Sequence, residues 1–154
     1  MASDDGTPVA FDDPEPIRQG LVRLRDGWGE EVLQLRPATP VLVEKKGLFG
    51  KVKQVEAEIT VQVVWYGTPE GEGGFVIGFH HPPGPPLSQR VVPFPENAKL
   101  LGEGDEYASV ELPDELSPAA AAQVVAYLAG VFLAAYGQTG MLMDSLDAPG
   151  SVGD

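Results

Sequence analysis

Apolar and polar residues alternate most regularly in the segment Lys53–Tyr66. Every second residue from Val55 to Trp65 is apolar, and most of the positions between them are polar. A period of two predicts a β-strand with one buried face and one solvated face. Because parallel sheets are usually covered on both faces, a solvated face favours an antiparallel sheet.

A turn-forming segment follows this predicted strand, since residues 67–74 read GTPEGEGG. Glycine and proline at such density interrupt regular structure. Beyond this segment, Phe75, Ile77 and Phe79 again occupy every second position, over the range Phe75–His80. Two alternating segments with a turn between them predict a β-hairpin.

Weaker alternating patterns predict five further strands. They cover Leu21–Arg25, Glu31–Leu35, Val41–Lys45, Gln89–Phe94 and Tyr107–Leu112. Most of the connections between the predicted strands are short, and together with the hairpin the strands number about seven. Strands joined in this way predict a meander or a barrel.

One helix is predicted towards the C-terminus, where Ser117 is a suitable N-cap and Pro118 suits the first helical position. No charged residue interrupts the segment Ala119–Tyr136, and Gly137 is well placed to end the helix. The helix is apolar around its whole circumference, so a contact with the sheet on one side leaves apolar surface on the other. The helix therefore needs a second apolar surface, besides the sheet, to cover its other side.

Small residues spaced by four form a smooth stripe along this helix. They are Ala122, Ala126, Gly130 and Ala134. A groove within the domain, a symmetric dimer or a membrane would each cover the helix. The apolar run has about the length of a membrane span, but its flanks are acidic and lack lysine and arginine. We therefore expect a homodimer with these four residues at its interface, and a membrane span is disfavoured.

These elements predict an α+β protein. A curved antiparallel sheet, or a partly closed barrel, of about seven strands packs against one apolar C-terminal helix in a single domain of residues 17–140. Residues 1–16 and 141–154 have few apolar anchors, so we expect a disordered and a flexible acidic tail. Residues 1–16 also lack the basic and apolar regions of a signal peptide, which favours a cytoplasmic location.

The charge balance narrows the possible functions. The 154 residues include 23 acidic and 10 basic side chains, which give a formal net charge of −13. A protein this acidic repels a phosphate backbone at long range, which argues against a general nucleic-acid binder. The chain has no cysteine, so disulfides, thiol catalysis and cysteine-ligated metals are excluded.

The most unusual segment is basic, since residues 45–53 read KKGLFGKVK. Four lysines and two glycines surround an apolar tip. The candidate binding residues are Lys45, Lys46, Leu48, Phe49, Lys51 and Lys53. The pattern predicts a hairpin loop that binds an anionic partner, which is a phosphate group, a membrane headgroup or an acidic protein. The alternative is an ordinary turn whose lysines discourage edge pairing.

Residues suited to catalysis or metal binding are few. His80 and His81 are the only histidines, and neighbours on a strand point to opposite faces, so the pair is poorly placed to chelate one ion. The sequence offers no third ligand nearby, no serine-nucleophile motif and no calcium-loop spacing. We therefore predict no catalytic residue, metal or cofactor, and we retain His80 as a polar group for a ligand.

Three functions remain open from the sequence. The first is a non-enzymatic binding or scaffold module that forms a homo-oligomer and binds another protein or an anionic ligand through its lysines. The second is a small-ligand or enzymatic pocket beneath the helix, lined by Trp65, Phe75, Phe79 and Tyr127, with His80 beside it. The third is an acidic mimic of nucleic acid that binds a basic protein, because nine acidic residues after Lys99 have no basic counterpart.

Overall fold

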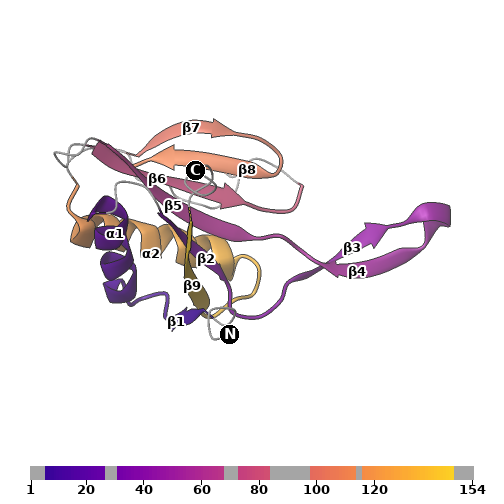
Figure 1. Cartoon of the computed structure of the whole chain (residues 1–154). Coiled ribbons are helices and arrows are strands. Elements are labelled where there is room, and N and C mark those ends of the chain that lie inside the picture. Colours follow the sequence, from indigo (N-terminus) through magenta and orange to yellow (C-terminus); the bar gives the residue numbers. More distant parts are fainter. Residues whose placement is uncertain (1–5, 27–30, 68–72, 84–97, 114–115, 148–154) are drawn as a thin grey trace.

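The computed structural model describes residues 6–26, 31–67, 73–83, 98–113 and 116–147. Its body is an antiparallel sheet of seven strands with two helices packed against it (Figure 1). A separate two-stranded sheet projects from this body. The predicted α+β fold, with an antiparallel sheet and a C-terminal helix, is therefore confirmed.

The elements follow one another along the chain in an order that does not match their order in the sheet. They are β1 (Thr7–Val9), α1 (Glu15–Asp26), β2 (Glu31–Pro37), β3 (Leu42–Lys46), β4 (Val52–Glu56), β5 (Thr60–Gly67), β6 (Gly73–His80), β7 (Lys99–Glu103), β8 (Tyr107–Glu111), α2 (Pro118–Ala134) and β9 (Met141–Asp147). In space the order is β1-β9-β2-β5-β6-β8-β7, so β1 and β7 are the edges. Within the described ranges these two edges do not pair with each other, and the sheet is open rather than closed into a barrel.

β5 and β6 form the hairpin that the alternating pattern predicts. The cross-strand neighbours on its buried face are Val61 and Phe79, Val63 and Ile77, and Trp65 and Phe75. All six side chains are at most 7% exposed. On the opposite face, the side chain of Gln62 donates a hydrogen bond to the side-chain oxygen of Gln34 in β2 (2.9 Å). The hairpin thus has one apolar and one polar face, as the sequence requires.

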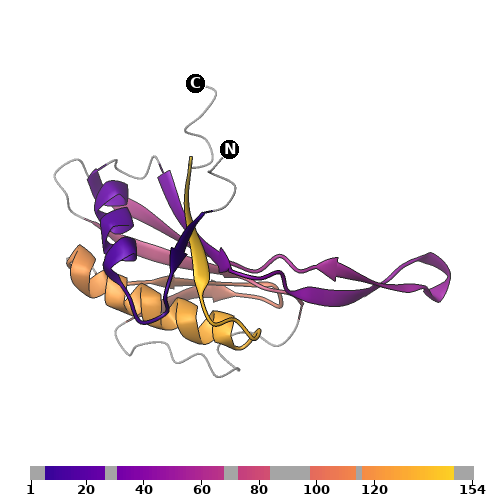
Figure 2. The same cartoon turned by 90° about the horizontal axis from the view of Figure 1, so that it is seen from below.

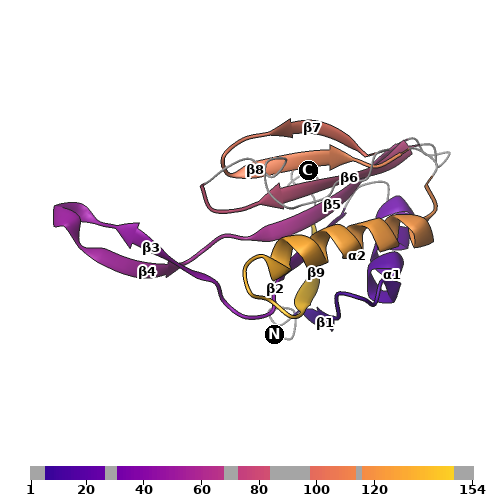
Figure 3. The ribbon, with the colours of Figure 1, turned by 180° about the vertical axis from the view of Figure 1, so that it is seen from behind.

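The long alternating segment forms two strands, which corrects the prediction of one strand over Lys53–Tyr66. Three residues, 57–59, lie between β4 and β5, and in this gap the N–H of Ala57 donates to the carbonyl of Val41 (2.8 Å). β4 pairs with β3 as an antiparallel ribbon outside the main sheet. We call this ribbon, residues 42–56, the arm (Figure 3).

The predicted strand Leu21–Arg25 is wrong, because these residues belong to α1. The buried residues of α1 are Ile17, Gly20, Leu21 and Leu24. They follow the three- and four-residue spacing of one helix face. A window of five residues shows too little of this spacing to exclude a strand. The predicted strand Gln89–Phe94 lies outside the described residues.

Two strands lie in segments predicted to be tails. β1 falls within residues 1–16, and β9 falls within residues 141–154 and lies between β1 and β2. Met141 is 1% exposed, and the Nε of Arg36 in β2 lies 2.8 Å from the Oδ2 of Asp144 in β9. The tail predictions are wrong for these two strands, because long-range pairing holds them. Residues 1–5 and 148–154 lie outside the described residues.

α2 begins where the sequence predicts. The Oγ of Ser117 accepts a hydrogen bond from the N–H of Ala120 (3.1 Å) and caps the first turn, while Gly137 beyond the last turn has a φ of +81°. The ring of Phe132 packs edge-to-face on Phe79 of β6, with the ring centres 5.3 Å apart, and this contact holds α2 on the sheet. Figure 2 views the molecule from the side on which α2 lies. Among the described helices, none is long and apolar enough to cross a membrane.

Candidate functional site

The arm extends away from the seven-stranded sheet and ends in a tight turn (Figures 1 and 3). β3 and β4 pair from Leu42 opposite Glu56 to Lys46 opposite Val52. A single 3₁₀ turn over Leu48–Gly50 closes the ribbon. Across the base of this turn, the N–H of Gly47 donates to the carbonyl of Lys51 (2.6 Å). The ribbon therefore holds its end residues clear of the body.

Leu48 and Phe49 form the tip of the arm. Their exposed fractions are 84% and 98%, the largest among the large hydrophobic side chains of the described residues. Phe49 has a φ of 65° and a ψ of 23°, in the left-handed region that a phenylalanine rarely adopts. That conformation costs roughly 1–2 kcal/mol. The turn thus exposes an apolar ring and at the same time carries backbone strain.

The four lysines surround this tip on both faces of the ribbon. Lys45 lies directly opposite Lys53, whereas Lys46 lies opposite Val52 and, by the alternation of a strand, on the other face. Like charges placed directly opposite each other destabilise a strand pair. In the described part of the chain, none of the four lysines takes part in an ion pair. The arm therefore carries uncompensated positive charge.

Charge changes sign along the arm. Its outer part, residues 45–53, has four lysines and no acidic residue, while Glu44 and Glu56 lie on the body side of it. The predicted binding residues that the structure brings together on this outer part are Lys45, Lys46, Leu48, Phe49, Lys51 and Lys53. His80, the remaining predicted residue, lies at the end of β6 and not at the tip.

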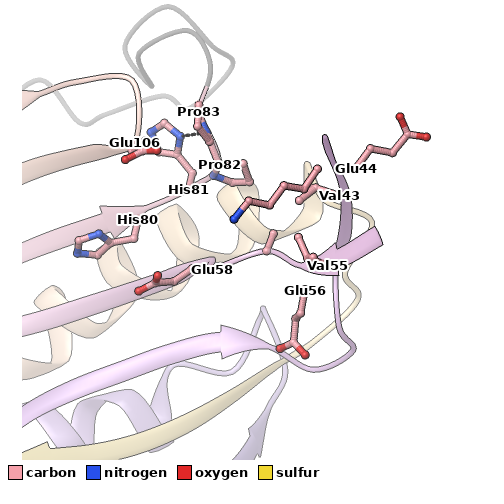
Figure 4. A pocket seen from close by; sticks show the side chains of 12 residues that line it. Val43, Glu44, Val55, Glu56, Glu58, His80, His81, Pro82, Pro83 and Glu106 are labelled. Atoms are coloured by element: carbon pink, nitrogen blue, oxygen red, sulfur yellow. Dashed lines mark hydrogen bonds between the residues drawn. The ribbon is translucent and has the colours of Figure 1, made fainter. Parts of the chain in front are cut away.

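A cleft of about 460 Å³ lies where the arm joins the body (Figure 4). Val43, Lys45 and Val55 line it from the arm, and the body contributes His80 and the segment that follows it. The other lining residues are Glu44, Glu56, Ala57, Glu58, His81, Pro82, Pro83 and Glu106. Glu58, Glu106, Lys45 and the two histidines thus lie around a partly apolar hollow, whereas Figure 4 shows the side chains of Glu44 and Glu56 pointing away from it. The sequence did not indicate this cleft, because its walls come from distant parts of the chain.

His80 and His81 point to opposite faces, as the sequence predicts. His80 is exposed, whereas His81 is 3% exposed and its ring lies edge-on to Phe132, with the ring centres 6.5 Å apart. The Nδ1 of His81 donates to the carbonyl of Pro82 (2.8 Å). Its Nε2 is buried and finds no hydrogen-bond partner in the described part of the chain. The described residues contain no cluster of three or more His, Asp or Glu that could hold a metal ion.

The aromatic residues expected to line a pocket beneath the helix fill the core instead. Phe75 and Phe79 are at most 1% exposed, and the rings of Trp65 and Phe75 pack edge-to-face with their centres 5.0 Å apart. Tyr127 is 54% exposed and faces solvent. The predicted lining is therefore corrected, because the rings of Trp65, Phe75 and Phe79 are buried in the core and Tyr127 lies at the surface.

The stripe of small residues on α2 is mostly covered by this chain itself. Ala122 and Ala126 are 0% and 4% exposed, and Gly130 lies under Phe11. Ala134 is exposed. Ala126, Gly130 and Ala134 nevertheless line an open, mostly apolar hollow beside Phe11 and Tyr127, so the predicted dimer interface stays a prediction.

Comparison with known proteins identifies no relative of this chain. No protein family matches the chain, and neither the curated proteins nor the solved structures include a significant match.

Proposed function

We propose that this protein is a non-enzymatic binding module and that the outer part of the arm is its partner-binding surface. The observation that carries the proposal is the near-complete exposure of Leu48 and Phe49 at the end of a projecting ribbon. Moving one such side chain from water into an apolar environment is worth about 1.5–3 kcal/mol. The fold itself gains none of this free energy, so the gain is available to a partner that covers the tip.

The conformation of the arm supports the same proposal. An isolated two-stranded ribbon is marginally stable in water. This ribbon also carries a left-handed phenylalanine and two lysines in direct opposition, both of which lower its stability. Unfavourable local features of this kind are typical of functional surfaces, where a bound partner offsets them.

A capture experiment tests the proposal with the full chain. The variant Leu48→Ser/Phe49→Ser removes the apolar tip. Its matched control, Leu100→Ser/Leu101→Ser, removes two side chains on edge strand β7 that are 40% and 48% exposed. The wild type and the β7 control are expected to retain the same partner from a lysate of the source organism, and the tip variant is expected to lose it. Equal capture by all three proteins would count against the arm as the binding surface.

The cleft at the base of the arm supports a second candidate function, the binding of a small ligand. Its support is the buried Nε2 of His81, which lacks a hydrogen-bond partner in the described ranges beside a hollow of about 460 Å³. A ligand that bound there would stabilise the folded state by mass action. A rise in melting temperature with a metabolite, absent from the variant His81→Leu, is the expected result. An equal rise in that variant would place the ligand elsewhere.

A further inference from the structure

The outer part of the arm has an apolar apex with a ring of cations behind it. Leu48 and Phe49 occupy the apex. The lysines behind it, which we call the basic collar, are Lys45, Lys46, Lys51 and Lys53. Because the collar occupies both faces of the ribbon, a partner that covers one face leaves part of the charge unmatched. A flat surface approached end-on meets the apex first and the whole collar next.

The type of cation favours a diffuse anionic surface over a protein pocket. All four collar residues are lysine and none is arginine. Arginine is enriched at protein–protein interfaces and makes bidentate contacts with carboxylates, whereas lysine is depleted there. Lysine acts as a compact point charge that needs no fixed geometry, and clusters of basic residues are attracted to anionic lipid headgroups.

The arm separates its apex, and to a lesser extent the collar, from the acidic body. The chain carries a net charge of −13, although residues 45–53 alone carry +4. The step from Leu42 to Lys46 along β3 spans about 13 Å at the rise of a strand, and Lys45, which also lines the cleft at the base of the arm, lies about 10 Å from Leu42. The Debye length is about 8 Å at an ionic strength of about 0.15 M. Repulsion between the body and an anionic surface is therefore partly screened when the collar reaches that surface.

We infer that the arm binds end-on to a lipid bilayer that contains anionic headgroups. Leu48 and Phe49 enter the boundary between headgroups and acyl chains, and the basic collar lies at the level of the lipid phosphates and carboxylates. Bound anions also remove the repulsion between Lys45 and Lys53. This inference rests on the proposed function and specifies the chemistry of its partner.

Vesicle sedimentation tests the electrostatic part. The full chain at about 0.15 M salt is expected to bind vesicles of phosphatidylcholine with phosphatidylserine, but not vesicles of phosphatidylcholine alone. Each basic residue near such a surface contributes about fivefold in affinity, so Lys45→Gln/Lys53→Gln is expected to bind about thirtyfold more weakly. Lys99→Gln, on the exposed edge strand β7, is the matched control and is expected to bind like the wild type.

Fluorescence tests the insertion of the tip. The variant Phe49→Trp places an indole at the apex, and Leu101→Trp places one on β7 as the control. On addition of anionic vesicles, the emission at position 49 is expected to shift to shorter wavelength and to be quenched by acyl-chain quenchers. The emission of the control is expected to stay unchanged.

Lipid binding and tip-dependent partner binding are tested separately, so either can fail without the other. Absence of binding to anionic vesicles, equal binding to both vesicle types, or equal binding by wild type and collar variant overturns the lipid assignment. If capture from a lysate still depends on Leu48 and Phe49, the arm remains the binding surface and its partner is an acidic protein. If capture is also independent of the tip, the proposed function fails as well.

Discussion

Phe11 lies over Gly130 of α2 so closely that a Cβ added to the glycine would come within 3.3 Å of the Cβ and Cγ of Phe11. The segment between β1 and α1 thereby covers the middle of the small-residue stripe. Ala126, Gly130 and Ala134 still border an open hollow, so the homodimer expected from the sequence stays a prediction.

This contact makes Gly130 sensitive to added volume. Gly130→Leu is expected to displace Phe11 and to lower the free energy of unfolding by about 1–3 kcal/mol, as overpacking does. Ala134→Leu, one turn further along the stripe and exposed, is expected to change it by less than about 0.5 kcal/mol. Urea unfolding measures both values. If the stripe instead joins two copies, both variants will be destabilised and light scattering will show a loss of dimer.

Phe132 links α2 to the sheet through Phe79. Phe132→Ala is expected to lower the free energy of unfolding by about 3–5 kcal/mol, because the truncation leaves a cavity between helix and sheet. Tyr127→Ala removes an aromatic side chain from the exposed side of the same helix and is expected to cost far less. Similar losses in the two variants would show that the structure assigns the buried side of α2 incorrectly.

Glu15 at the start of α1 is expected to titrate far below its usual range. Hydrogen bonds from Arg18 (2.8 and 2.6 Å), and a weaker one from Gln19 (3.1 Å), lower the pKa of Glu15 from 4.5 to about 2. A lowered pKa favours the folded state above about pH 4.5, and this contribution is lost as the pH falls towards 2. Carboxyl chemical shifts recorded against pH measure the titration.

A pair of substitutions tests whether Arg18 lowers the pKa of Glu15. Arg18→Gln is expected to raise the pKa of Glu15 towards 4.5, since it removes the largest of the causes that lower it, the hydrogen bonds from Arg18, together with the coulombic attraction of Arg18. Arg25→Gln, at the other end of α1, is expected to leave it unchanged. An unaltered titration of Glu15 in the Arg18 variant would refute the proposed hydrogen bonds.

The opposition of Lys45 and Lys53 lowers the stability of the arm. Lys53→Glu turns it into an attractive cross-strand pair and is expected to stabilise the arm by about 0.2–1 kcal/mol, seen as slower amide exchange in β3 and β4. Gln54→Glu places a carboxylate opposite Glu44 and is expected to have the opposite effect. If Lys53→Glu stabilises the arm and also weakens partner binding, the repulsion in the wild type is a cost of function.

Several features of this protein follow from local sequence alone. Alternation requires only that neighbouring side chains point to opposite faces, so the β5–β6 hairpin and the opposed His80 and His81 could be predicted. The Ser117 cap involves atoms three residues apart and is equally local. The hairpin end with its apolar tip and lysines could be predicted for the same reason, whereas its role in binding stays a proposal.

Tertiary structure alone decided where the strands lie and which surfaces remain open. Alternation runs through residues 57–59, so only the contact between Ala57 and Val41 shows that the chain leaves the arm there and joins the sheet. The apolar residues of β9 do not alternate with polar ones, and its pairing with β1 and β2 places it in the sheet. A contact between residues distant in the sequence also covers Gly130 with Phe11, whereas Phe49 is 98% exposed. A periodic pattern indicates that one face of a segment is apolar. Which other segment covers that face depends on how the rest of the chain is arranged in space.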